Sequence, residues 1–262
     1  MKYKEIYSLL IGVSLIGIAC QKTTTAPAVS GVAALTVVNA IPNSGPVVPV
    51  INTSGAIMYF SSAQVVGYGG SYEYSPVAGN DTVYVVQDNS DTANIGPKVI
   101  GLMYYNILGL KKSGIYSLFL CGTDTTSPDY LFTTDTLAYY PPSDSVMGIR
   151  LVNLSTGSNP ISINLEGNAN GSEVGSLPYK GITGFKTYPC NSTTNDYFFV
   201  IRDAATGDSL TQFDFGSQNN GYGLVNIYNG GLLLTFRNVT IAVYGSETDM
   251  NNPLNTMLIN NY

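Results

Sequence analysis

The side chains that could catalyse a reaction in this chain are carboxylates, because its 262 residues include no histidine. Without imidazole, Ser-His-Asp and Cys-His catalysis, histidine metal ligands and histidine pH switches are excluded. Twelve Asp and five Glu remain. Two of them could hydrolyse a glycosidic bond only if they faced each other across a cleft, roughly 5–9 Å apart. Most of these acids lie among turn-forming residues, so we expect no catalytic residue and no enzyme activity.

One segment resembles a calcium-binding loop. The run Glu166-Gly-Asn-Ala-Asn-Gly171 has the alternating oxygen donors and the turn glycine of an EF-hand. Its first position is Glu where Asp is usual, and its twelfth is Leu177 where a bidentate Glu is needed. The segment therefore fails at both ends and is better interpreted as an Asn/Gly hairpin loop. We expect no metal and no cofactor.

The amino terminus has the pattern of a secretory signal. Lys2 and Lys4 precede an apolar stretch from Ile6 to Ala19, which is too short to cross a bilayer core of about 30 Å as a helix. The run Ile16-Gly-Ile-Ala-Cys20 resembles a bacterial lipobox, in which the cysteine becomes the lipidated first residue. Gly17 and Ala19 would also suit an ordinary signal peptidase, which is the alternative.

The sequence therefore predicts a signal peptide over residues 1–19, lipidation of Cys20 and a flexible tether over residues 20–32. A lipid anchor would make the membrane a partner and would place the chain in the cell envelope, as an outer-membrane lipoprotein. The surface face and the periplasmic face both remain open. A net charge of −6 with eleven basic residues argues against a nucleic-acid partner.

The rest of the chain has the pattern of short strands. β-branched and aromatic runs of four to eight residues are bounded by turn residues, and 28 glycines and 13 prolines suit many tight turns. The clearest runs are Thr82–Gln87, Ile115–Leu120, Tyr197–Arg202 and Asn238–Tyr244. We expect an all-β fold, with inward-facing and outward-facing residues alternating in antiparallel β-sandwiches.

The runs also repeat along the chain. Leu35–Asn39 matches Ile149–Asn153, and the runs 83–88 and 116–122 match 198–203 and 239–245 in the same order. Matches at nearly constant spacing indicate two tandem copies of one domain of about 110 residues. The predicted domains are a first β-sandwich over residues 33–140, a linker over residues 141–146 and a second β-sandwich over residues 147–262.

These motifs resemble those of a bacterial family, the domain-of-unknown-function family numbered 4397. The resemblance lies in the valine-rich strand that ends at Asn39-Ala-Ile-Pro42, in the strand from Tyr116 to Gly122, and in a second copy over residues 148–165. It implies tandem immunoglobulin-like sandwiches in secreted or lipid-anchored proteins of the Bacteroidota type. The family has no assigned activity, so the resemblance identifies no functional residue.

Two pairs of adjacent tyrosines are candidates for stacking on a ligand. Neighbouring residues on a strand face opposite ways, so at most one of each pair can belong to the core. An exposed ring could stack on a sugar or on a partner protein, although outward tyrosines often only fill the surface of a sheet. The pairs are Tyr104 with Tyr105 and Tyr139 with Tyr140.

Six sites resemble the motif Asp-[Ser/Thr]-[Ala/Ile/Leu/Val/Met/Thr], at which Bacteroidota O-glycosylate exported proteins. Composition alone predicts about one match. The alternative is that an Asp followed by a β-branched residue is simply how a turn enters a strand. The hydroxyl residues of the motifs are Thr82, Thr92, Thr125, Thr136, Ser145 and Ser209.

Two thiols remain besides Cys20. An export compartment permits a disulfide between Cys121 and Cys190. Cys121 lies in an apolar strand, which favours a buried free thiol, and Cys190 follows Pro189 in a turn. A free thiol at each position is the main interpretation, with the disulfide as the alternative.

Together, these features predict a lipid-anchored cell-envelope protein with a non-catalytic binding or structural role. Its partner would be a glycan or an envelope protein. The alternatives are a glycan-binding accessory lipoprotein, an adhesive or structural surface subunit and, least favoured, a carboxylate-based hydrolase.

Overall fold

The computed structural model describes residues 31–52, 64–89, 98–141, 143–190, 197–215, 225–226, 231–232 and 234–261. The predicted signal peptide, Cys20, most of the tether and Thr92 lie outside these residues and stay predictions. The proposed domain boundaries also stay predictions.

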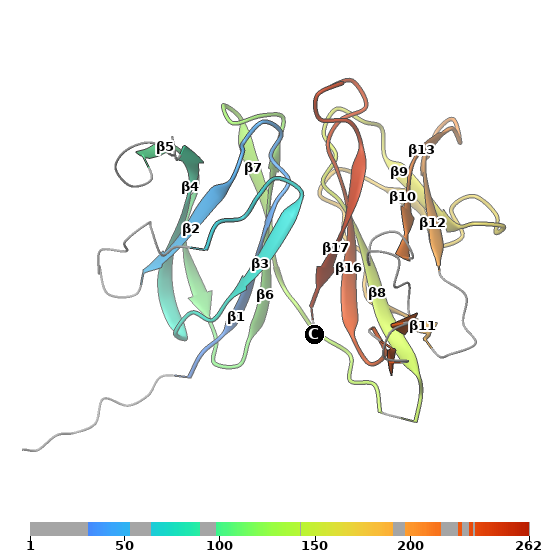
Figure 1. Ribbon diagram of the computed structural model, residues 1–262, viewed down its shortest axis with the longest axis horizontal. Coiled ribbons are helices and arrows are strands. Elements are labelled where there is room, and N and C mark those ends of the chain that lie inside the picture. Colours follow the sequence, from blue (N-terminus) through green and yellow to red (C-terminus); the bar gives the residue numbers. More distant parts are fainter. Residues whose placement is uncertain are drawn as a thin grey trace, which may run out of the picture. The chain divides into compact units, whose positions relative to one another are not determined.

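The first half of the chain forms two sheets (Figure 1). One has the strand order β3-β1-β6-β7, and the other has the order β2-β4-β5. The strands are β1 (Ala34–Asn39), β2 (Val47–Asn52), β3 (Gly70–Tyr74), β4 (Gly79–Asn89), β5 (Lys98–Leu110), β6 (Ile115–Gly122) and β7 (Pro128–Thr134).

The second half repeats this arrangement with sheets of order β11-β8-β16-β17 and β10-β9-β12-β13, and β14 and β15 form a small hairpin. The first strand, β8, begins at Val146, inside the predicted linker. The strands are β8 (Val146–Asn153), β9 (Ile161–Leu165), β10 (Val174–Leu177), β11 (Lys186–Pro189), β12 (Phe198–Asp203), β13 (Ser209–Asp214), β14 (Val225–Asn226), β15 (Gly231–Leu232), β16 (Asn238–Tyr244) and β17 (Asn255–Asn260).

The all-β prediction is confirmed, with four main sheets in two sandwich-like units. Purely antiparallel pairing is not found, because β1 pairs with β6 and β8 pairs with β16 in parallel. The members of each parallel pair are separated by several other strands. A connection that long lets the chain re-enter the sheet in its original direction, which a hairpin cannot do.

The sequence repeat has a counterpart in strand register. Leu35 lies opposite Tyr116 in the first parallel pair, and the matching residues Ile149 and Val239 lie opposite each other in the second. The other sheets agree, since β4 lies between β2 and β5 as β12 lies between β9 and β13. Matching segments thus occupy matching places in both copies.

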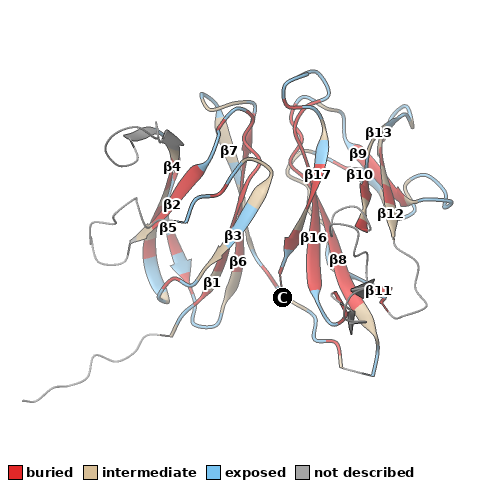
Figure 2. Cartoon of the chain, in the orientation of Figure 1, coloured by how far each residue is buried: buried red, intermediate tan, exposed pale blue. Residues whose placement is uncertain are grey.

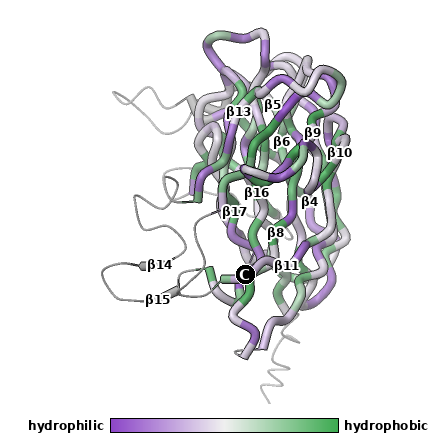
Figure 3. The backbone as a smooth tube through the Cα atoms, turned by 90° about the vertical axis from the view of Figure 1, so that its right-hand side faces the viewer, coloured by the Kyte–Doolittle hydropathy of each residue, from purple (hydrophilic) through white to green (hydrophobic). Residues whose placement is uncertain are grey.

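Each half has its own core, built from alternate residues of its strands. Val83, Val85 and Leu118 lie in the first core, and Phe199 and Phe213 lie in the second. Figure 2 shows buried residues concentrated along β8 and β16, and Figure 3 shows hydrophobic residues along the central strands.

A third apolar cluster joins the two halves. Val38 and Phe119 on β1 and β6 belong to one cluster with Val152 and Ala242 on β8 and β16. By the sequence repeat, Val38 matches Val152 and Phe119 matches Ala242. The same outward positions of both copies therefore form the interface. The expected alternation of core and solvent faces fails on these four central strands, because both of their faces are buried.

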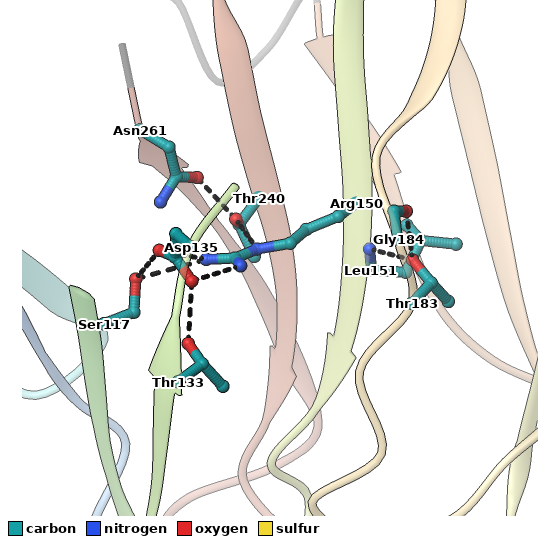
Figure 4. Close-up of polar contacts among 9 residues, drawn as sticks. All are labelled: Ser117, Thr133, Asp135, Arg150, Leu151, Thr183, Gly184, Thr240 and Asn261. Atoms are coloured by element: carbon teal, nitrogen blue, oxygen red, sulfur yellow. Dashed lines mark hydrogen bonds and ion pairs between the residues drawn. The ribbon is translucent and has the colours of Figure 1, made fainter. Parts of the chain in front are cut away.

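A buried ion pair crosses this interface, in addition to the more exposed Lys180–Asp129 pair. The guanidinium of Arg150 on β8 donates from Nη1 to Oδ1 of Asp135 at 2.6 Å and from Nη2 to Oδ2 at 2.9 Å (Figure 4). The two side chains are 5% and 1% exposed. Nη2 also donates to Ser117 Oγ at 3.1 Å, and Nε donates to Thr240 Oγ1 at 2.7 Å.

Asp135 also accepts hydrogen bonds from two hydroxyl groups, and Arg150 also contacts an aromatic ring. The hydroxyls of Ser117 and Thr133 donate to the Asp135 carboxylate. The guanidinium carbon lies 4.8 Å from the ring centroid of Phe185. Four hydrogen bonds from the guanidinium and the ring contact therefore offset the loss of solvent, which makes the buried ion pair tolerable.

We expect Arg150→Met to lower the free energy of unfolding by about 3–5 kcal/mol, because Asp135 would stay buried without its cation. The double variant Arg150→Met with Asp135→Leu should recover a large part of that loss. The control is Lys180→Met, which removes the half-exposed Lys180–Asp129 pair and should cost less than about 1 kcal/mol. Urea unfolding measures all three, and equal losses in the two single variants would contradict this role of Arg150.

Both described cysteines are free and fully buried. Cys121 belongs to the cluster that joins the halves and Cys190 belongs to the second core, so the disulfide alternative is not realised. Burial raises the pKa of the Cys121 thiol to about 11 and also raises that of Cys190.

A folded Cys20→Ala variant should therefore react slowly with a thiol reagent at pH 8, because little thiolate is present and neither sulfur is accessible. After unfolding in guanidinium without reductant, it should release two thiols per chain. A count of zero would show that the two cysteines are bonded.

Candidate functional site

Strand β5 forms an unpaired sheet edge in the described structure. It is the last strand of the order β2-β4-β5 and pairs with β4 along its length. At 13 residues it is also the longest strand with described bounds. A long edge strand presents a row of backbone donors and acceptors that another chain can use.

Two bulges decide which side chains of β5 face outward. Tyr104 lies opposite Val85 and Leu102 lies opposite Val86, which leaves Met103 as an extra residue. Gly101 is a second extra residue, with a φ of +78°. Because a bulge resets the alternation of a strand, Met103 and Tyr104 can both be buried although they are adjacent.

The outward residues of β5 form an apolar row. Leu102, Tyr105 and Ile107 are 58%, 61% and 59% exposed, and the exposed parts of β5 are pale blue in Figure 2. Tyr84 of β4 lies directly opposite Tyr105 and packs against a small outer cluster that contains Val86. We define Tyr84, Leu102, Tyr105 and Ile107 as the β5 face.

The charges around the β5 face lie at its ends. Residues 99–110 include no charged side chain, whereas Lys98 precedes them and Lys111 and Lys112 follow. Lys111 and Lys112 are both exposed. An uncharged edge with basic ends suits an extended polypeptide that has apolar residues in its middle and acidic residues at its ends.

The four predicted stacking tyrosines do not form one site. Tyr104 is buried beside Tyr130, with ring centroids 4.8 Å apart, and burial raises its pKa to about 12. Tyr140 is also buried, so neither ring offers a free face in this structure. Tyr105 belongs to the β5 face, and Tyr139, which is 83% exposed, lies between β7 and β8.

The predicted glycosylation sites differ in accessibility. Thr136 and Ser209 are exposed, whereas Thr82, Thr125 and Ser145 are partly exposed.

Three of the aspartates in these motifs have a structural role or are buried. Asp135 is bound by Arg150, Asp81 is buried, and Asp124 accepts hydrogen bonds from Thr126 and Ser127 in its own turn. The turn interpretation therefore explains part of the excess of motifs, and occupancy of the sites stays a prediction.

The described residues contain no group of three or more Cys, Asp or Glu side chains arranged to hold a metal ion. Within the same residues, no helix has the length and hydrophobicity of a membrane span. The EF-hand-like segment lies between β9 and β10, and Leu177, at its twelfth position, is buried.

Two substitutions test the assignment of inward and outward residues on β5. Tyr104→Ala should lower the free energy of unfolding by about 3 kcal/mol, because it leaves a cavity in the core. Tyr105→Ala should change it by less than about 0.5 kcal/mol, because the ring is exposed. Urea unfolding of both variants checks the assignment, and the reverse order of effects would show that the bulges are misplaced.

Comparison with known proteins identifies no family. No protein-family model matches the chain, so the resemblance to family 4397 rests on its motifs alone. No curated protein matches either.

Two solved structures show a distant likeness. One is a candidate adhesin from Bacteroides ovatus, at 13% identity and a TM-score of 0.24, covering 87% of this chain and 92% of that one. The other is the fimbrial anchor protein Mfa2 from Porphyromonas gingivalis, at 12% identity and a TM-score of 0.26, covering 88% and 100%. At TM-scores this low, the likeness supports no conclusion about this chain.

Proposed function

We propose that this chain is a lipid-anchored protein of the cell envelope with a non-catalytic binding role. The amino-terminal pattern supports the anchor, since an apolar signal segment ends directly before Cys20. The polar residues that follow Cys20 would form the tether. In this proposal the lipid holds the chain at the outer membrane and the two sandwiches present its binding surface.

The observation that carries the binding role is the β5 face. Leu102, Tyr105 and Ile107 are each more than half exposed on an edge that pairs with no other described strand, and solvent contact with apolar side chains is unfavourable. A partner strand added to β5 would satisfy the backbone groups of the edge and cover these side chains together. Lys111 and Lys112 favour an acidic residue at the end of that strand.

The occupant that we propose is therefore an extended segment of an envelope protein. A glycan that stacks on Tyr105 is the other outcome. The two differ in what they need from the edge, because a strand uses the backbone and the whole apolar row whereas a sugar needs mainly the ring.

The test is site-specific photocrosslinking in the native host. A photoreactive residue at Tyr105 should give a discrete protein adduct, and adding Ile107→Lys should reduce its yield at least tenfold. Gln212, an exposed residue of β13, is the matched control, because β13 is the corresponding edge strand of the second copy. No adduct from Tyr105, or the same adducts from both positions, would contradict the β5 proposal. A glycan adduct that survives Ile107→Lys would favour the sugar.

Intact mass spectrometry of the same preparations tests the anchor. The mature chain should carry the mass of a diacyl or triacyl cysteine, and a Cys20→Ala variant should lack it. Repeating glycan increments would report occupied glycosylation sites. An unmodified chain that begins at residue 20 would contradict the anchor.

A further inference from the structure

A pocket lies at the edge of the first sandwich that contains β2 and β3. Strand β5 forms the opposite edge of the sheet to which β2 belongs. The volume of the pocket is about 290 Å³. Pro49 and Ile51 of β2, Tyr74 of β3 and Asp81 of β4 contribute to its lining, together with Pro76 and Val77. Because β2 and β3 are the edge strands of their two sheets, the pocket lies where the core opens toward the edge.

Asp81 is a buried carboxylic acid without a hydrogen-bond partner among the described residues. Its side chain is 0% exposed, and neither carboxylate oxygen has a hydrogen-bond donor within reach among the described residues. Burial raises its pKa above the ordinary value for Asp. A buried carboxyl group normally has hydrogen bonds or a cation, because losing water without a replacement costs several kcal/mol. Among the described residues, the geometry therefore leaves a place for a further hydrogen-bond donor at Asp81.

The other residues that line the pocket indicate what kind of ligand would carry that donor. Pro49, Ile51 and Val77 offer apolar surface to a ligand. The hydroxyl of Tyr74 donates to the backbone oxygen of Gln64 at 2.8 Å, which fixes the ring at the pocket. A ligand that matches these walls has an aliphatic body and one strongly donating end.

The acid also recurs in the second copy. Asn80-Asp81 directly precedes the run 82–87, and Asn195-Asp196 stands at the matching place before the run 197–202. The pair has thus been retained in both copies although the strands after it have diverged, from Val83-Tyr84 to Phe198-Phe199. This repetition favours a role for the acid beyond the needs of the first core.

We propose that this pocket binds a primary ammonium group on an aliphatic stem, with Asp81 as its counter-ion. Because Asp81 is fully buried in this structure, the pocket wall in front of its carboxylate shifts as the ammonium approaches and donates to it, and the stem contacts Ile51 and the proline rings. A lysine side chain of a partner protein and a free alkylamine share this chemistry. The net charge of −6 attracts either of them over a distance.

The test uses the chain with Cys20→Ala and follows amide chemical shifts during titration with n-butylamine, Nα-acetyl-lysine methylamide and, as the neutral control, 1-pentanol. Both amines should bind saturably, and Asp81→Asn should weaken them at least tenfold. Asp144→Asn, which changes an exposed carboxylate, should leave binding unchanged. Binding of butylamine without the lysine derivative would identify a free amine as the ligand.

Three outcomes would overturn the proposal. These are the absence of saturable amine binding, equal binding by Asp81→Asn, and equal binding of 1-pentanol. Thermal unfolding is a second readout, because removing an unpaired buried charge should keep or raise the melting temperature. A fall of several degrees in Asp81→Asn would show that Asp81 has a structural partner and would be a fourth result against the proposal. None of these results bears on crosslinking at Tyr105, so this proposal and the β5 proposal fail separately.

Discussion

The arrangement of the two sandwiches depends on the burial of one arginine. Arg150 is the only charged residue of β8 and reaches Asp135, which follows the last strand of the first half. By the sequence repeat, the residue that matches Arg150 is Thr36, which lies beside Ser117, and Ser117 also contacts the guanidinium. The two copies therefore differ in chemistry at this position of their interface. An apolar interface can slide, whereas a two-pronged hydrogen-bonded ion pair defines a single register.

The apolar cluster around this ion pair explains an unusual feature of the central strands. In an isolated sandwich, one face of each sheet meets solvent and should carry polar residues. Here β6, β8 and β16 are buried nearly end to end. Their sequences are correspondingly apolar on both faces, as in Leu118-Phe119-Leu120 and Ile241-Ala242-Val243. The lack of a polar face was thus a signal for an internal interface, visible in the sequence before the partner surface was known.

Strand composition predicted the fold class, and the internal repeat predicted which segments would occupy equivalent positions. Single residues were harder to place. Simple alternation predicts that at most one tyrosine of the 104–105 pair is buried, but which one depends on the bulges at Gly101 and Met103. Asp135 and Asp81 looked like parts of a surface motif, whereas one is bound by Arg150 and the other lines a pocket. Such contacts join residues far apart in the chain, which local sequence patterns cannot encode.

The parallel pairing of β1 with β6 also determines how the first sandwich would carry a mechanical load. Six residues, Ala34–Asn39, pair in parallel with β6, so the beginning of β1 and the end of β6 lie at opposite ends of the ladder. A chain held before residue 34 and pulled through its second half would load these hydrogen bonds in shear, all at once. An antiparallel hairpin pulled at its open end would instead separate one bond at a time. The strand nearest the tether is therefore paired in the geometry that best resists force along the chain.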